Sequence, residues 1–165
     1  MKVSAATKLA ATLKHMDKKV VLAESCTGGR AAALLTLEPG VSAHFCGSTV
    51  TYQEAVKSAW LGVDAELIEA HTAESAETTL AMAIGILQRT DAADWSVAVT
   101  GHFGPGAPPE KDGVIFIATA QRLDQSQQTH WQQFKLTSDS RGDRQLEAAE
   151  LTLDFLLQGI LKARN

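Results

Sequence analysis

Three segments of the sequence place reactive or glycine-rich residues where a strand is expected to end. The first is "AESCTGG", residues 23–29, which follows the apolar run 20–23. Ser25 could act there as a nucleophile. The backbone N–H groups that follow it could bind an anion or an oxyanion, and they belong to Cys26, Thr27, Gly28 and Gly29. The alternative is structural: Ser25 or Thr27 caps the next helix, and the glycines form a tight turn.

A nucleophilic serine needs a base, and the second segment offers one. "TYQEAVK", residues 51–57, places Tyr52 at the end of a strand and Lys57 about one and a half turns into the following helix. Lys57 could accept a proton if burial lowers the pKa of its amine, and both side chains could face the same crevice as Ser25. Alternatively, Tyr52 packs at the sheet edge and Lys57 is a solvated surface lysine. The five histidines form no recognisable triad signature, and no G-x-S-x-G motif is present.

The third segment is "TGHFGPG", residues 100–106, at the end of another strand. Its glycines would make a rigid loop with exposed N–H groups, which suits a phosphate or an amide oxygen. His102 could contact a ligand or be a solvated loop residue. The candidate binding residues of this segment are Thr100, Gly101, His102 and Gly104.

A fourth segment, "SDSRGDR" at residues 138–144, precedes the last expected helix. Arg141 and Arg144 could clamp a phosphate, because a guanidinium binds phosphate with two parallel hydrogen bonds. The alternative is a solvated helix cap, with Asp143 favouring the helix N-terminus.

Composition narrows the class of ligand. The net charge is −4 and no run of Lys or Arg occurs, so we expect neither a nucleic-acid partner nor an anionic membrane surface. No apolar run approaches the ~18 residues that a membrane span needs, and we expect no signal peptide. No HExxH, Cys/His cluster or paired-carboxylate pattern indicates a metal. Spacing alone leaves a disulfide between Cys26 and Cys46 open, but we expect reduced thiols in a cytoplasmic protein.

The hydrophobic pattern predicts a single domain over residues 1–165. Helices are expected over 3–16, 27–36, 53–62, 64–70, 76–89 and 145–162, and strands over 20–23, 45–52, 94–100, 114–120 and 130–136. A long Gly/Pro loop over 101–113, a polar turn over 121–128 and a loop over 138–144 complete the chain. Early strands alternate with helices and late strands are consecutive. This order predicts an α/β fold, a three-layer α/β/α sandwich with a mixed, mostly parallel sheet.

The same segments resemble the CinA C-terminal domain family. The resemblance rests on "AESCTGG", on "VTYQEAVK" followed by "LGV", on "AMAIGIL", on "SVAVTGHFGPG" and on "EKDGVIFIATA", and it runs from about Lys14 to the C-terminus. Stand-alone members of this family are nicotinamide mononucleotide (NMN) deamidases. The resemblance implies the three-layer fold, hydrolysis of NMN to nicotinic acid mononucleotide and ammonia without metal or other cofactor, and a homo-oligomer.

The resemblance also assigns roles to residues. It implies that Ser25 is the nucleophile and Lys57 the general base, with Tyr52 beside it. Gly142-Asp143-Arg144 matches the family's "GDR". One departure bears on the substrate: the family's "SGxAGP" reads "TGHFGP" here, so Phe103 replaces a small residue and could narrow or reshape the pocket. Two other interpretations stay open, an amidase for a different small amide and a catalytically altered or idle nucleotide-binding or regulatory module on the same scaffold.

Overall fold

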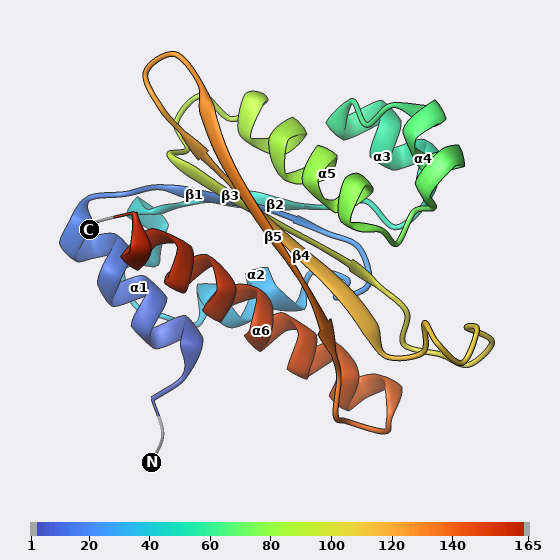
Figure 1. Ribbon diagram of the computed structural model, residues 1–165. Coiled ribbons are helices and arrows are strands. Elements are labelled where there is room, and N and C mark those ends of the chain that lie inside the picture. The colour runs from blue at the N-terminus through green and yellow to red at the C-terminus, as the bar shows by residue number, and fades with distance from the viewer. Residues whose placement is uncertain (1–2, 164–165) are drawn as a thin grey trace.

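Strands in the described part of the chain form one mixed sheet between two helical layers (Figure 1). The structure is a computed structural model that describes residues 3–163. The strand order is β2-β1-β3-β4-β5. The bounds are Val20–Glu24 for β1, Phe45–Val50 for β2, Trp95–Gly101 for β3, Val114–Arg122 for β4 and Gln127–Lys135 for β5. Because β1 pairs in parallel with β2 and β3 while β4 is antiparallel to β3 and β5, only β4 runs against the common direction of these strands.

Helices cover both faces of the sheet, as Figure 1 shows. One layer holds α1 (Ala5–Met16), α2 (Arg30–Thr36) and α6 (Arg141–Lys162), and the other holds α3 (Glu54–Leu61), α4 (Ala65–His71) and α5 (Ala76–Gln88). A short 3-10 turn spans Val41–Ala43. None of these helices is both long and apolar enough to cross a membrane. The α/β fold class, the three-layer sandwich and the mixed sheet are therefore confirmed.

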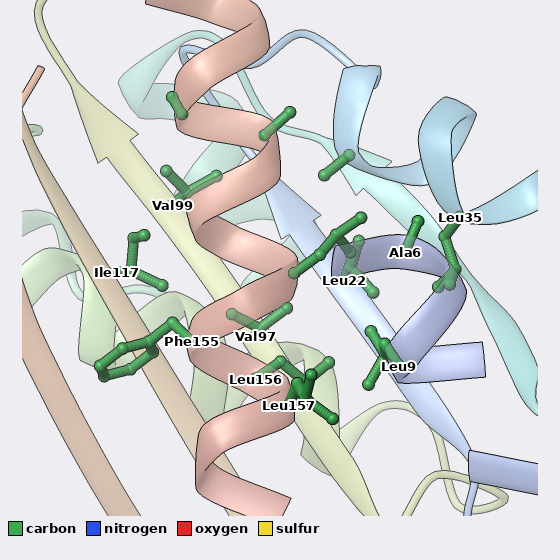
Figure 2. Packing of buried hydrophobic residues seen from close by; sticks show 14 of the residues in the cluster. Ala6, Leu9, Leu22, Leu35, Val97, Val99, Ile117, Phe155, Leu156 and Leu157 are labelled. Atoms are coloured by element: carbon green, nitrogen blue, oxygen red, sulfur yellow. The ribbon is translucent and has the colours of Figure 1, made fainter. Parts of the chain in front are cut away.

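The two faces of the sheet carry separate hydrophobic cores. Leu22, Val97 and Ile117 point toward α1 and α6 and pack with Leu9 and Leu156 (Figure 2). On the opposite face, a second cluster packs against α5 and includes Val21, Ala98, Ala118, Met82 and Ile86. Strand β1 is buried along its whole length, as expected for an apolar run covered by helices on both faces.

Several element boundaries differ from the sequence prediction, and β2 ends at Val50, so Tyr52 follows the strand and does not end it. The turn between β4 and β5 is much shorter than 121–128, because both polar strand ends continue the hairpin pairing as far as Arg122 and Gln127. Helix α6 begins at Arg141 and not after Arg144, because the Ser140 side chain caps it by accepting from the Asp143 N–H. Helix α2 begins at Arg30, three residues later than expected.

The carboxyl ends of β1, β2 and β3 meet at one edge and hold the "AESCTGG" turn. The Ser25 N–H donates to the Val99 carbonyl of β3, and the Thr51 N–H donates to the Glu24 carbonyl of β1. Helix α3 then packs closely on α5, where a Cβ at Gly85 would overlap the Leu61 carbonyl oxygen. Parallel pairing and this close approach fix where the turn and the first turns of α3 lie relative to each other.

Candidate active site

Lys57 and Ser25 lie within hydrogen-bond distance inside the protein. Lys57 Nζ is 3.0 Å from Ser25 Oγ. The same amine donates to the Thr51 carbonyl oxygen at 2.8 Å, which fixes its position. Lys57 is fully buried and Ser25 is 6% exposed. The structure thus brings together the predicted nucleophile and the predicted base from two segments 32 residues apart.

Burial makes the Lys57 amine a stronger candidate for a base. Removal from water lowers its pKa from the ordinary value near 10.5, and the Glu74 carboxylate opposes this with a smaller upward effect. Both hydrogen-bond partners of Nζ are neutral oxygens, so no carboxylate at hydrogen-bond distance holds the charged form. A neutral amine at this distance can accept the serine proton.

Glu24 organises the turn that carries Ser25, and sequence reasoning missed it. Its carboxylate is fully buried at the end of β1. It accepts five hydrogen bonds, at 2.7–3.1 Å, from the hydroxyls of Thr27 and Ser48 and from the N–H groups of Gly29, Ala31 and Ala32. An anion at a helix N-terminus satisfies N–H groups that have no partner within the helix. A carboxylate directly after the buried run "VVLA" was the signal that could have identified it.

This arrangement corrects two predictions about the turn. Neither Ser25 nor Thr27 caps α2: the cap position is Gly29 in a left-handed conformation, and the Thr27 hydroxyl donates to Glu24. The Gly28 N–H donates to the Ser25 carbonyl and the Gly29 N–H donates to Glu24, so both are already used. Within residues 3–163 the N–H groups of Cys26 and Thr27 donate to no other residue, and of these two residues only Cys26 lines the cavity beside Ser25, so the Cys26 N–H is the candidate donor to an oxyanion.

A cavity of about 270 Å³ opens beside Ser25. Several of the predicted residues line it: Ser25, Cys26, Tyr52, Gly101, His102, Gly104 and Arg141. Further lining residues were not predicted to bind substrate: Glu74, Phe103, Pro105, Gly106, Ala107 and Pro108. The cavity therefore lies between the β1–α2 turn, the loop after β3 and the start of α6.

Arg141 links separate walls of this cavity. Its guanidinium donates to the Tyr52 hydroxyl at 2.9 Å and to the Gly104 carbonyl oxygen at 2.6 Å. It also lies over the Phe103 ring, 5.9 Å from the ring centre. Phe103 is 5% exposed and belongs to the core cluster on the α6 side. Phe103 thus packs against the Arg141 guanidinium and also lines the cavity.

Tyr52 lines the same cavity as Ser25, as predicted, but its hydroxyl is hydrogen-bonded to Arg141. The Tyr52 side chain is 58% exposed. The hydrogen-bond partners of the Lys57 amine are Ser25 and Thr51, so no hydrogen bond joins it to the Tyr52 hydroxyl. Tyr52 is placed to contact a ligand at the cavity rim.

Other predicted binding residues serve the scaffold. Thr100 is fully buried, and its hydroxyl lies 2.7 Å from that of Thr79 in α5. Arg144 forms two hydrogen bonds with the Asp112 carboxylate, at 2.7 and 3.0 Å, and donates to the Phe103 carbonyl. These bonds lower the pKa of the Asp112 carboxyl. Neither Thr100 nor Arg144 lines the cavity, and each side chain is held by partners elsewhere, Thr79 and Asp112 respectively. Thr27, Gly28 and Gly29 likewise lie outside the lining.

The cysteines and potential metal ligands add little to the site. Cys26 and Cys46 are both free thiols. Burial raises the pKa of the Cys26 thiol to about 12, so this residue is a poor nucleophile despite its place beside Ser25. Within residues 3–163 no group of three or more His, Cys, Asp or Glu side chains is arranged to hold a metal ion.

Comparison with known proteins shows the same domain elsewhere. The family model described as "CinA C-terminal domain" matches residues 2–160. A CinA-like protein of Myxococcus xanthus is 38% identical over 154 residues, which cover 92% of this chain and 35% of that protein. A CinA-like protein of Synechocystis is 42% identical over 117 residues, 70% of this chain and 28% of that protein. The chain thus matches only about a third of the length of these relatives.

Solved structures extend the similarity over nearly the full length of both chains. A CinA superfamily protein of Klebsiella pneumoniae has a TM-score of 0.87 at 26% identity, with 96% of each chain covered. A competence/damage-inducible protein of Agrobacterium tumefaciens has a TM-score of 0.84 at 32% identity, with 96% of this chain and 98% of that chain covered. From the family model and these relatives, the chain belongs to the CinA C-terminal domain family.

Proposed function

We propose that this chain is a metal-independent amidohydrolase that converts NMN and water to nicotinic acid mononucleotide and ammonia. The observation that carries the proposal is the contact of 3.0 Å between the buried Lys57 amine and the Ser25 hydroxyl. A buried amine with a lowered pKa beside a serine supplies both base and nucleophile from the protein itself. The resemblance of the sequence to NMN deamidases supplies the substrate.

In the first half-reaction, Lys57 Nζ takes the Ser25 proton while Oγ attacks the carbonyl carbon of the amide. The carbonyl oxygen becomes an oxyanion, which the N–H group of Cys26 in the cavity lining would stabilise. The C–N bond then breaks, and the Lys57 ammonium returns its proton to the departing nitrogen, which leaves as ammonia. Ser25 is left as an ester of the pyridine carboxylate.

In the second half-reaction, water attacks this ester and Lys57 accepts a proton from the water. The bond to Ser25 Oγ breaks, the serine recovers a proton from Lys57, and the carboxylate product is released. Arg141 is the candidate for the 5′-phosphate, because its guanidinium lines the cavity and its partners are the neutral oxygens of Tyr52 and Gly104. Arg144, already paired with Asp112, is not proposed for this role.

The test is ammonia release from NMN by the purified chain with a chelator present. We expect the wild type to release ammonia and Ser25→Ala to release none while keeping its fold, as judged by circular dichroism and thermal melting. Ser126→Ala, in the exposed turn before β5, is the matched control and should retain full activity. Ammonia release by Ser25→Ala, or none by a folded wild type, would contradict the proposal.

Two results would point to the other interpretations of this scaffold. If NMN binds to the wild type without turnover, an idle nucleotide-binding or regulatory module is favoured. If NMN is inert but another small amide is hydrolysed, the site is an amidase with a different substrate. A cytoplasmic location and a homo-oligomer stay predictions.

A further inference from the structure

Glu74 places a carboxylate in the wall of the candidate active site. It precedes α5, whose N-terminal cap is Ser75, and lines the cavity together with Ser25, His102 and Arg141. Its side chain is 28% exposed, and one carboxylate oxygen lies 3.4 Å from His102 Nε2. The mechanism proposed above gives Glu74 no task.

The cavity presents one fixed negative and one fixed positive charge. Of the side chains that line it, Glu74 is the carboxylate and Arg141 the guanidinium. No Lys or Arg within residues 3–163 forms an ion pair with Glu74, and no carboxylate within that range pairs with Arg141. Neither charge is therefore paired with a fixed opposite charge: Glu74 contacts His102, and the partners of Arg141 are neutral oxygens.

Glu74 also lies close enough to the reacting groups for its charge to matter there. Its negative charge raises the pKa of Lys57, although burial lowers that pKa by more. A carboxylate with this influence on Lys57 also acts on the ring of any amide that Ser25 attacks. In a partly enclosed cavity, such a charge interacts more strongly than it would in bulk water.

We propose that Glu74 is a binding group for a cationic ring, so that the site selects amides on positively charged heteroaromatic rings over neutral ones. This inference rests on the proposed function and deepens it. NMN carries a positively charged pyridinium ring next to its amide and an anionic phosphate at its other end. Glu74 and Arg141 match these two charges in sign. Dihydro-NMN, the reduced form of NMN, has the same amide and the same phosphate. Its dihydropyridine ring is neutral, so it lacks the charge that Glu74 would recognise.

The experiment compares binding of NMN and dihydro-NMN by calorimetry. It uses the full chain with Ser25→Ala, so that neither compound is consumed, with and without Glu74→Gln. With Glu74 present, NMN should bind about tenfold more tightly than dihydro-NMN, and Glu74→Gln should remove most of this preference. Binding of dihydro-NMN should change little. Glu77→Gln is the matched control: it removes a charge three residues further on, outside the cavity lining, and should leave the preference intact.

The outcomes separate this inference from the proposed function. An unchanged preference in Glu74→Gln, or equal weakening of both compounds, overturns the role of Glu74 even if the wild type releases ammonia from NMN. A preference that depends on Glu74 in a chain that releases no ammonia supports the cation site and refutes the deamidase. Thermal melting of each variant confirms that the comparison is made between folded proteins.

Discussion

Among residues 3–163, Lys57 has the largest volume of the fully buried residues, and its burial is the central fact of the site. Transferring a charged amine out of water costs several kcal/mol unless the charge is paired or lost. In the described part of the chain no carboxylate lies at hydrogen-bond distance from the Lys57 amine, so burial favours its neutral form. Neutrality is what a general base requires.

The first prediction concerns the pH dependence of activity. Because burial lowers the pKa of Lys57, kcat/KM for NMN should rise with pH through that pKa, with the ascending limb below the ordinary value near 10.5. Lys57→Arg should show no such limb and little activity, since a guanidinium stays protonated. Steady-state rates measured across the alkaline range test this. An identical limb in Lys57→Arg would mean that another group is the base.

The free energy of unfolding should also depend on whether the Lys57 amine carries a proton. Between the folded pKa of Lys57 and its unfolded value near 10.5, the unfolded chain binds a proton that the folded chain lacks. The free energy of unfolding therefore rises with pH in this window. Lys57→Met has no such proton, so the wild type should gain stability relative to this variant as pH rises toward 10.5. Urea unfolding at several pH values measures the difference, and a difference that is constant with pH would argue against a lowered pKa.

Glu24 gives a prediction about positioning. Both its oxygens accept from donors, so a glutamine amide must turn its NH₂ group toward at least one of them. Glu24→Gln should cost roughly 2–4 kcal/mol in unfolding free energy and most of the activity. Glu54→Gln, at the exposed first turn of α3, is the control and should cost less than about 1 kcal/mol. Full activity in Glu24→Gln would show that the turn does not depend on the carboxylate.

At the scale of elements, the seating of α3 on α5 decides where Lys57 lies. Gly85 in α5 lets the Leu61 carbonyl at the end of α3 approach closely. Gly85→Ala should push the two helices apart, cost about 1–3 kcal/mol and lower kcat, although alanine is intrinsically the better helix former.

Gly142→Ala is the matched control for that substitution. Gly142 lies in α6 with open space where its Cβ would be, so the exchange should stabilise the protein by about 0.5–1 kcal/mol. Chemical denaturation of both variants measures whether each substitution raises or lowers the free energy of unfolding. If Gly85→Ala were as stabilising as Gly142→Ala, the close approach of α3 to α5 would not constrain the site.

At the scale of the whole molecule, most elements could be predicted because buried positions carry apolar residues, whose spacing in the sequence indicates a helix or a strand. Val20–Ala23 is apolar throughout, and it is a strand covered on both faces. The ends of the β4–β5 hairpin could not be predicted, because Gln127 and Gln128 are exposed and carry no burial pattern. Arg141 and Arg144 were assigned to a loop because their polar segment gives no helical period.

The site could be predicted only where a reactive type of residue follows the end of a predicted strand. Ser25 and Lys57 follow strand ends, and the sheet brings these ends together. Glu24 was missed because a charged residue directly after a buried strand is ordinarily predicted to be exposed to solvent. Glu74 was missed because its segment precedes a helix and follows no strand. Thr100 was assigned to the cavity because its position at the end of β3 does not reveal that its side chain turns toward α5.

The complete burial of Lys57 has a practical consequence for chemical coupling. Reagents that acylate amines must reach the nitrogen, and exposed lysines such as Lys8, Lys14, Lys135 and Lys162 offer theirs to solvent while Lys57 does not. Attachment to a solid support through surface amines should therefore leave the rate of the proposed NMN hydrolysis largely unchanged, with Lys57 unmodified in peptide mass spectra. Loss of activity in step with modification of Lys57 would mean that the interior opens to solvent. If Lys57 stays unmodified while the surface amines react, its burial separates the proposed base from the lysines that are open to coupling.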